Sequence, residues 1–192
     1  MALLKDGRLV DDPWVRVDGD IAGLSHALVP LAQWQAQREA WLRHDGRLGV
    51  LLDSDEGPEA IAEDLPDLDL VALTFPKFTD GRAYSAARVL RARYGFRGEL
   101  RAVGQVLRDQ LAFMQRVGFD AYELPDDADV DAWRAAFVEI GPVYQPAADR
   151  RRPAYTLRQA RPAAAAASDG GAVGYAAAQG PMTGAVAAHW AY

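Results

Sequence analysis

The chain has 192 residues and a formal net charge of −6, and 50% of its residues are hydrophobic. This length and composition predict one globular domain with a substantial hydrophobic core. The absence of cysteine excludes disulfides, thiolate nucleophiles and cysteine-held iron–sulfur clusters.

Membrane insertion and nucleic-acid binding are not expected. No apolar run reaches the roughly 18 residues that a membrane span needs, and the opening M-A-L-L-K-D-G lacks the features of a signal peptide. We therefore expect a cytoplasmic protein. The residues from Arg150 onward carry a net charge of +4 and the rest of the chain carries −10. Such an acidic body does not favour nucleic acid as a partner.

The first 46 residues predict a β-hairpin followed by a helix. Asp6-Gly7, which supplies positive φ to a tight turn, lies between the two apolar arms of L-L-K-D-G-R-L-V. We expect a third extended piece, residues 14–17, to join the hairpin. Apolar residues then recur at helical spacing at Leu31, Trp34, Trp41 and Leu42. Gly46 can end this helix.

Residues 47–146 alternate between short apolar strands and helices. The predicted strands are 47–52, 68–75, 99–103 and 120–124. The predicted helices follow at about 58–65, 80–94, 107–117 and 133–140. This alternation predicts an α/β fold of four or so parallel strands, either as an open sheet or as part of a barrel. With the N-terminal hairpin and helix, it would form one domain over residues 1–146.

From about Ala147 the composition changes to R-R-R-P, a run of alanines and glycine-rich sequence. Such a segment has little apolar surface to offset its ordering entropy, so we expect residues 147–192 to be mostly disordered. The basic run Arg150–Arg152 could bind an acidic partner, or it could simply be solvated.

Polar side chains follow the predicted strands, where the strand-to-helix loops of a parallel sheet converge and ligands bind. They are Lys77, Thr79, Asp80, Arg82, Gln105, Arg108 and Glu123. Lys77 and Arg82 beside a helix N-terminus predict a site for phosphate, sulfate or sulfite. The alternative is that Asp80 pairs with one of these cations while it caps the helix, which is the commoner role of charged loop residues.

Two carboxylates are candidate acid or base groups. Asp80 lies in the same loop as the cations, and Glu123 lies near the end of a strand, where it could also be a solvated strand end. Gln105 and Arg108 could face the same mouth, or they could belong to an ordinary helix surface. No phosphate-loop or dinucleotide motif is present, so no cofactor is evident. The widely spaced His26, His44 and His189 support neither a metal site nor a catalytic triad.

Four stretches resemble a bacterial family known as domain of unknown function 934. They are F-P-K-F-T-D-G-R-A-Y-S, R-Y-G-F-R-G-E-L-R-A-V-G-Q-V-L-R-D-Q-L, G-F-D-A-Y-E-L and V-Y-Q-P-A. The resemblance covers residues 1 to about 149, including L-L-K-D-G-R-L-V-D-D-P-W. Family members typically lie beside genes for assimilatory sulfite or nitrite reductase and for the reductase of activated sulfate, and they are often labelled probable oxidoreductases. Gln105 stands where an acidic residue is frequent, and Ala83 where glycine is frequent.

The resemblance implies a role in sulfur assimilation. The leading hypothesis is an accessory protein that binds the sulfite reductase or a neighbouring enzyme and holds an oxyanion at the predicted mouth. That mouth would consist of Lys77, Asp80, Arg82, Gln105 and Arg108. The alternative is an oxidoreductase or other enzyme that uses Asp80 or Glu123 as acid or base and clamps an anionic substrate with Lys77 and Arg82. A third hypothesis is a homo-oligomeric structural module.

Overall fold

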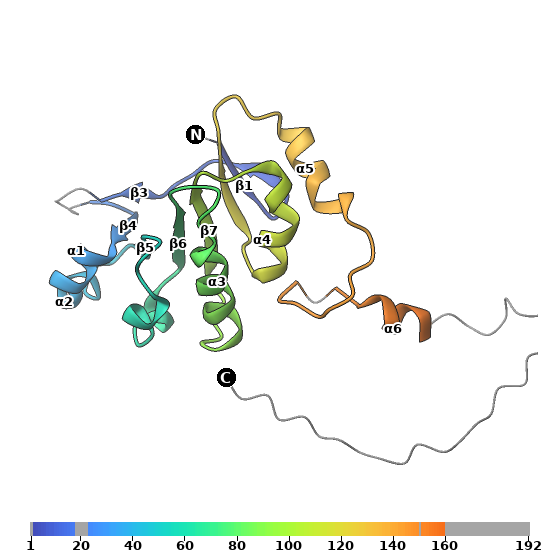
Figure 1. The fold of residues 1–192 in the computed structure, drawn as a ribbon. Helices are drawn as coiled ribbons and strands as arrows, with labels where there is room; N and C mark the ends of the chain where they lie inside the picture. Colours follow the sequence, from blue (N-terminus) through green and yellow to red (C-terminus); the bar gives the residue numbers. More distant parts are fainter. Residues whose placement is uncertain (1, 18–22, 150, 160–192) are drawn as a thin grey trace, which may run out of the picture.

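A computed structural model describes residues 2–17, 23–149 and 151–159, and Figure 1 shows its fold. These residues form a sheet of eight strands. The strands are β1 (Ala2–Lys5), β2 (Arg8–Val10), β3 (Val15–Arg16), β4 (His26–Pro30), β5 (Arg47–Leu52), β6 (Leu70–Phe75), β7 (Glu99–Gly104) and β8 (Ala121–Leu124). Their order in the sheet is β2-β1-β8-β7-β6-β5-β4-β3. The predicted α/β class and parallel sheet are confirmed.

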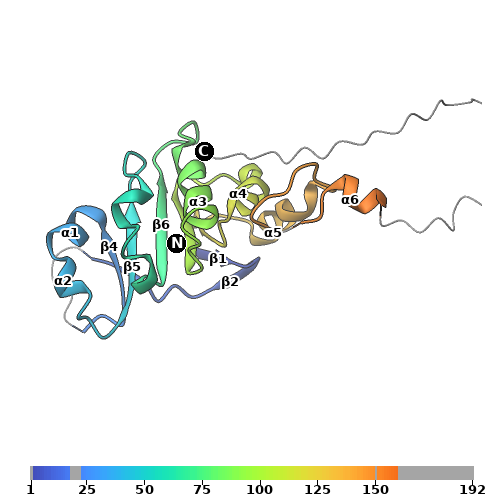
Figure 2. The same ribbon diagram turned by 90° about the horizontal axis from the view of Figure 1, so that it is seen from below.

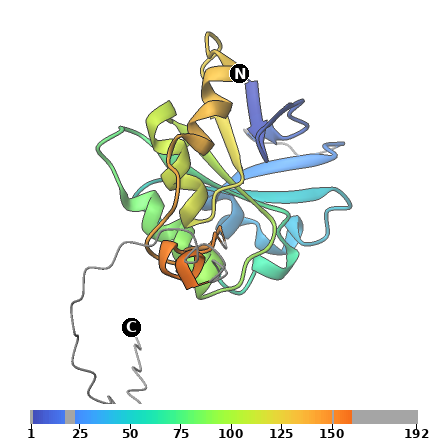
Figure 3. The same cartoon turned by 90° about the vertical axis from the view of Figure 1, so that its right-hand side faces the viewer.

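The strands β3 to β8 are parallel and follow one another in chain order, while the hairpin β1–β2 is antiparallel and joins at β8. Right-handed crossovers between neighbouring parallel strands place all connecting helices on one face. The sheet curls around its other face into a half-barrel, which Figure 3 shows from the side. The partial-barrel form of the prediction is therefore confirmed.

The connecting segments are mostly short. The α-helices are α1 (Leu31–Ala36), α2 (Arg38–Trp41), α3 (Arg82–Ala92), α4 (Leu111–Val117), α5 (Val130–Glu139) and α6 (Ala154–Gln159). The 3-10 turns are η1 (Pro58–Ile61), η2 (Leu65–Asp67) and η3 (Arg108–Gln110). No helix in this described part of the chain is long and apolar enough to cross a bilayer.

The main core lies between the sheet and the helices. Alternate strand residues such as Val50, Val71 and Phe75 are fully buried there and pack against helix residues such as Trp34 and Leu90. The opposite, concave face has a smaller apolar cluster of Leu28, Leu70, Ala72 and Val103, with Trp14 packed against it. The sheet is therefore covered on both faces, although only one face carries helices.

Several elements differ from the sequence prediction. The strand β4 was not predicted, because it has only Ala27, Leu28 and Val29 between a histidine and a proline. The extended piece at residues 14–17 pairs with β4 at the far edge of the sheet and not with the hairpin. The predicted helix over residues 31–46 is split at Gln37, whose φ of −132° is not helical.

The helix predicted at about 58–65 is also wrong, because only the turns η1 and η2 form there and Pro66 prevents a longer helix. The helix predicted from Asp80 begins at Arg82, and the one predicted from Leu107 begins as η3.

The predicted tail contains ordered structure up to residue 159. Val143 forms a parallel bridge with Pro153, and α6 follows at once. The amide of Ala148 donates to the carbonyl oxygen of Arg116 at 2.9 Å, which fastens this segment to the end of α4. The ordered part of the chain thus extends beyond residue 146, to residues 147–149 and 151–159, and the rest of the predicted tail, residues 160–192, lies outside the described residues.

The chain crosses the concave face between β2 and β3, which lie at opposite edges of the sheet. Figure 2 shows this blue segment running from β2 to the other side. Its Asp12 accepts hydrogen bonds from both terminal nitrogens of Arg101 in β7, at 2.7 and 3.1 Å. Arg101, only 1% exposed, also donates to Glu99 and lies 3.9 Å from Glu123.

The ends of the half-barrel are drawn together by a second ion pair. Arg16 in β3 donates to both carboxylate oxygens of Glu123 in β8, at 2.9 and 3.1 Å. In a flat sheet these strands would be about 24 Å apart, since they are separated by five spacings of roughly 4.8 Å. This contact therefore requires the curl of the sheet.

Arg101 is the centre of this network of charges. Burial opposes its charge, but the hydrogen bonds and negative charge of Asp12 and Glu99 outweigh that effect and raise the pKa of Arg101. Its removal would leave Glu99 and Glu123, whose side chains are 7% and 8% exposed, without their shared cation.

We therefore expect Arg101→Met to lower the free energy of unfolding by about 3 kcal/mol at pH 8, measured by urea denaturation. The control Lys5→Met removes a 40% exposed partner of Glu99 and should cost less than about 1 kcal/mol. An Arg101→Met deficit as small as that of the control would contradict this role.

Candidate functional site

The loop after β6, residues 76–81, joins that strand to α3 at the carboxyl edge of the sheet, and Asp80 and Arg82 pair there. The Nε and a terminal nitrogen of Arg82 donate to the two carboxylate oxygens of Asp80, at 3.0 and 2.7 Å. The backbone N–H of Arg82 also donates to Asp80, at 3.2 Å. These hydrogen bonds hold the pKa of Asp80 far below its usual range. The geometry matches the alternative in which Asp80 pairs with a cation, but the N-cap residue of α3 is Gly81, and Asp80 accepts only the first helical N–H, that of Arg82.

A cavity of about 330 Å³ lies between α3 and the loop that follows β5. Arg82 reaches into this region and donates to Ser54 at 2.9 Å. The loop also contributes Asp53, Asp55 and Glu56 to the cavity wall. Because carboxylates outnumber the single arginine in the wall, the electrostatic potential inside this cavity is unfavourable for binding sulfite or sulfate.

Lys77 and Thr79 are exposed in the loop after β6. The carbonyl oxygen of Lys77 accepts a hydrogen bond from the amide of Asp80 at 2.9 Å, which closes the turn. Neither side chain lines the cavity beside Arg82. The two predicted cations of the anion site, Lys77 and Arg82, are thus not brought to one cavity.

Gln105 and Arg108 have other partners. The side-chain oxygen of Gln105 accepts from the backbone N–H of Phe78 at 3.3 Å, so Gln105 supports the loop that carries Asp80. Arg108 turns toward α5, where its Nε donates to the carbonyl oxygen of Ala132 at 2.8 Å and a terminal nitrogen pairs with Glu139. The five-residue mouth predicted from the sequence is therefore not assembled, because Arg108 binds a different element.

Glu123 lies on the concave face, where it pairs with Arg16 and Arg101. It shares no partner with Asp80, so the structure does not join the two predicted acid–base candidates into one constellation. His26 packs edge-on against Trp14, and a ring nitrogen of His44 lies 2.8 Å from the carbonyl oxygen of Leu24. No cluster of potential metal ligands occurs in the part of the chain that the structure describes, and His189 lies outside that part.

A feature that the sequence reasoning missed is an exposed apolar surface around Gln110. It consists of Phe78, Leu107 and Phe113, which are 57%, 39% and 54% exposed, and we call it the aromatic surface. The side chain of Gln110 donates to the carbonyl oxygen of Phe78 at 3.5 Å, and its backbone N–H donates to that of Leu107 at 3.1 Å. The ring of Phe113 packs against Tyr84 at 5.0 Å. The position of Phe78 inside a charged loop is the only sequence signal for this surface.

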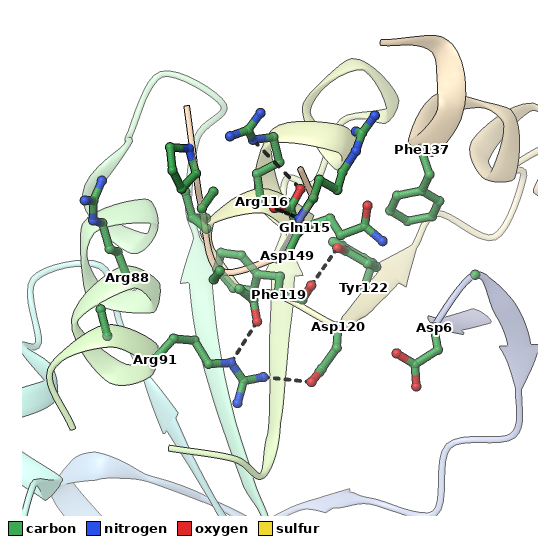
Figure 4. Close-up of a pocket in the computed structure, with 18 of the residues that line it drawn as sticks. Asp6, Arg88, Arg91, Gln115, Arg116, Phe119, Asp120, Tyr122, Phe137 and Asp149 are labelled. Carbon is green, nitrogen blue, oxygen red and sulfur yellow. Dashed lines mark hydrogen bonds and ion pairs between the residues drawn. The ribbon is translucent and has the colours of Figure 1, made fainter. Parts of the chain in front are cut away.

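A larger cavity of about 1170 Å³ opens at the opposite end of the strands, between α3, α4, α5 and residues 146–149 with Arg151 (Figure 4). Arg91 in its floor pairs with Asp120 at 2.7 Å. Burial raises the pKa of Asp120 despite this cation. Arg91 also donates to the carbonyl oxygens of Phe96, Gly98 and Gly118. It therefore has a structural role, and the sequence reasoning had given none of these residues a function.

The sequence model of a family described as "Bacterial protein of unknown function (DUF934)" matches residues 49–155, which is more than half of the chain. The chain therefore belongs to this family, as the resemblance of its motifs indicated. No curated protein matches the chain.

The pairing of Asp80 with Arg82 predicts a pH-dependent contribution to stability. A carboxylate with a depressed pKa in the folded state stabilises the fold above its unfolded pKa of about 3.9, and this stabilisation is lost as the pH falls below that value. Asp80→Asn keeps an acceptor for the N–H of Arg82 but removes the charge. We expect its melting temperature to be lower than that of the wild type at pH 7 and the difference to shrink below about pH 4.

The effect should also decrease in high salt, since the pair lies at the surface. Asp45→Asn, which alters an exposed carboxylate without an ion pair among the described residues, is the matched control and should show no such trend. A difference for Asp80→Asn that is the same at pH 3 and pH 7 would mean that the charge of Asp80 contributes nothing.

Proposed function

We propose that this family member is a cytoplasmic accessory protein of assimilatory sulfite reduction, which binds a reductase through the aromatic surface at the carboxyl edge of its sheet. The observation that carries the proposal is the exposure of Phe78, Leu107 and Phe113 around Gln110. Clustered large apolar side chains on a protein surface typically mark an interface with another protein.

The surface is supported from beneath, as an interface should be. Phe78 is held through its backbone by both Gln105 and Gln110. Phe113 rests on Tyr84, which in turn packs edge-on against the buried Phe75 at 5.1 Å. An aromatic ring packed in the way of Phe113 loses little conformational entropy when a partner covers it, so it is an efficient binding residue.

The neighbouring charged groups favour binding over catalysis. Asp80 is ionised and forms an ion pair with Arg82, and Glu123 forms ion pairs with Arg16 and Arg101. A general acid or base must exchange a proton near neutral pH, and the lowered pKa of Asp80 opposes this. Lys77, exposed beside Phe78, is available to attract an acidic partner.

The choice of partner rests on the family resemblance, which implies proximity to genes for sulfite or nitrite reductase and for the reductase of activated sulfate. The proposal that Arg82 binds an oxyanion has weaker support. The guanidinium group of Arg82 already donates hydrogen bonds to Asp80, and the wall of the smaller cavity beside it is acidic. A bound sulfite would have to displace that carboxylate.

The test is capture of the untagged neighbouring sulfite reductase by the tagged protein, followed by titration of the purified pair. We expect Phe78→Ser and Phe113→Ser each to weaken the complex at least about fivefold, since a buried aromatic anchor contributes more than about 1 kcal/mol. Tyr144→Ser, which alters an 80% exposed aromatic residue elsewhere, is the matched control and should leave the affinity unchanged.

An equal effect of all three substitutions would refute the assignment of the aromatic surface. An absorption spectrum of the isolated protein and an assay of turnover with sulfite address the alternative directly. A flavin or haem band, or turnover without the reductase, would replace the accessory role with an enzymatic one.

A further inference from the structure

The large cavity at the amino-terminal ends of β7 and β8 has a basic lining that the proposed function does not use. It lies at the other end of the strands from the aromatic surface. Its wall includes five arginines, which are Arg88, Arg91, Arg97, Arg116 and Arg151. Figure 4 shows Arg88 and Arg91 projecting from α3 on one side and Arg116 from α4 on another. The volume of about 1170 Å³ is sufficient for a whole organic ligand.

Two of these arginines have clear structural roles. Arg91 is saturated by Asp120 and by backbone carbonyl groups. Arg116 donates to the carbonyl oxygen of Gln145 at 2.6 Å and lies 4.0 Å from Asp149. Both are in the last turns of their helices, where a positive charge also offsets the helix dipole. These two cations need no ligand to explain them.

The side chains of the other three arginines have no carboxylate partner among the described residues. Arg88 comes from α3, Arg97 from the loop before β7 and Arg151 from the segment before α6. The guanidinium group of Arg151 donates only to the carbonyl oxygens of Ile140 and Gly141, while its backbone N–H donates to Oδ1 of Asp149 at 3.2 Å. Since Arg97 and Arg151 are outside helices, dipole compensation does not explain why they enter the same cavity. These three guanidinium groups make no ion pair, and they outnumber the one further carboxylate of the wall, Asp6, so the cavity favours a ligand with several negative charges.

The cavity also offers a buried acceptor and an apolar wall. The side chain of Asp149 is 5% exposed, and its Oδ2 accepts no hydrogen bond from the residues that the structure describes. A buried oxygen of this kind is costly unless a donor reaches it, and a ligand hydroxyl or amino group would be such a donor. Phe137 lines the same cavity and packs against Tyr122 at 5.5 Å, which provides an apolar surface for a ring.

From this combination we infer that the cavity binds an organic phosphate of the nucleotide class. Arg88, Arg97 and Arg151 would hold its phosphate groups, because guanidinium groups donate paired hydrogen bonds to phosphate oxygens. Asp149 would accept from a hydroxyl or amino group of the ligand, and Phe137 would contact its ring. The site is distinct from the aromatic surface, and its occupation would not depend on the reductase.

Isothermal titration of the full chain with ATP, inorganic tripolyphosphate and adenosine tests this inference. We expect ATP to bind more tightly than tripolyphosphate, and adenosine to bind most weakly. The double variant Arg88→Ala/Arg97→Ala should weaken ATP at least about tenfold, because hydrogen bonds to charged groups contribute more than about 1.4 kcal/mol. Both side chains are exposed and have no hydrogen-bond partner among the described residues, so the fold should be retained.

The matched control is Arg93→Ala, which removes an exposed arginine from the end of α3 that stacks on Tyr94 and does not line the cavity. It should change the affinity for ATP less than about twofold. Asp149→Asn should lower the ratio of ATP affinity to tripolyphosphate affinity, because the loss of charge acts on both anions whereas only ATP offers a donor to this side chain. The inference is overturned if ATP fails to bind at millimolar concentration, if it binds no better than tripolyphosphate, or if Arg93→Ala weakens it as much as the double variant.

Discussion

The half-barrel depends on the buried guanidinium group of Arg101. A curled sheet with helices on one face leaves a concave face that must be closed by something other than helices. Here the chain between β2 and β3 crosses that face, and the carboxylate of Asp12 fixes it to Arg101. Glu99, Glu123 and Arg16 extend the network from β7 to the far edge strand β3. Hydrophobic burial forms the sheet, and these directional ion pairs link its strands across the concave face.

Much of the fold could be predicted from residues 47–124, because four apolar runs there alternate with helical stripes and glycines that end helices. The Asp6-Gly7 hairpin was predictable for a similar local reason, since both residues adopt positive φ in the structure. The strand β4 was not predictable, because H-A-L-V-P is too short to show a period. Likewise, the pairing of residues 15–16 with β4 depends on contacts across the sheet that no local pattern encodes.

The candidate site was predicted only as a list of residue types. The sequence placed Asp80 and Arg82 in one loop, and they do pair with each other. It could not show that Arg108 would turn toward α5, since rotamer direction depends on the neighbouring helix. Nor could it show that Arg97 and Arg151, which are distant along the chain, would line one cavity. Charged residues are easy to find in a sequence, but their partners are decided by tertiary packing.

The strand order has a consequence for the way the chain reaches its fold. Each parallel strand from β4 to β8 pairs with its predecessor in the chain, so these pairs close loops of modest length. The hairpin is the exception, because residues 2–5 pair with residues 121–124. During synthesis the strands β1 and β2 must therefore wait for β8, the strand on which they dock. Until β8 is made, the apolar side chains of the hairpin stay exposed and need protection from other chains.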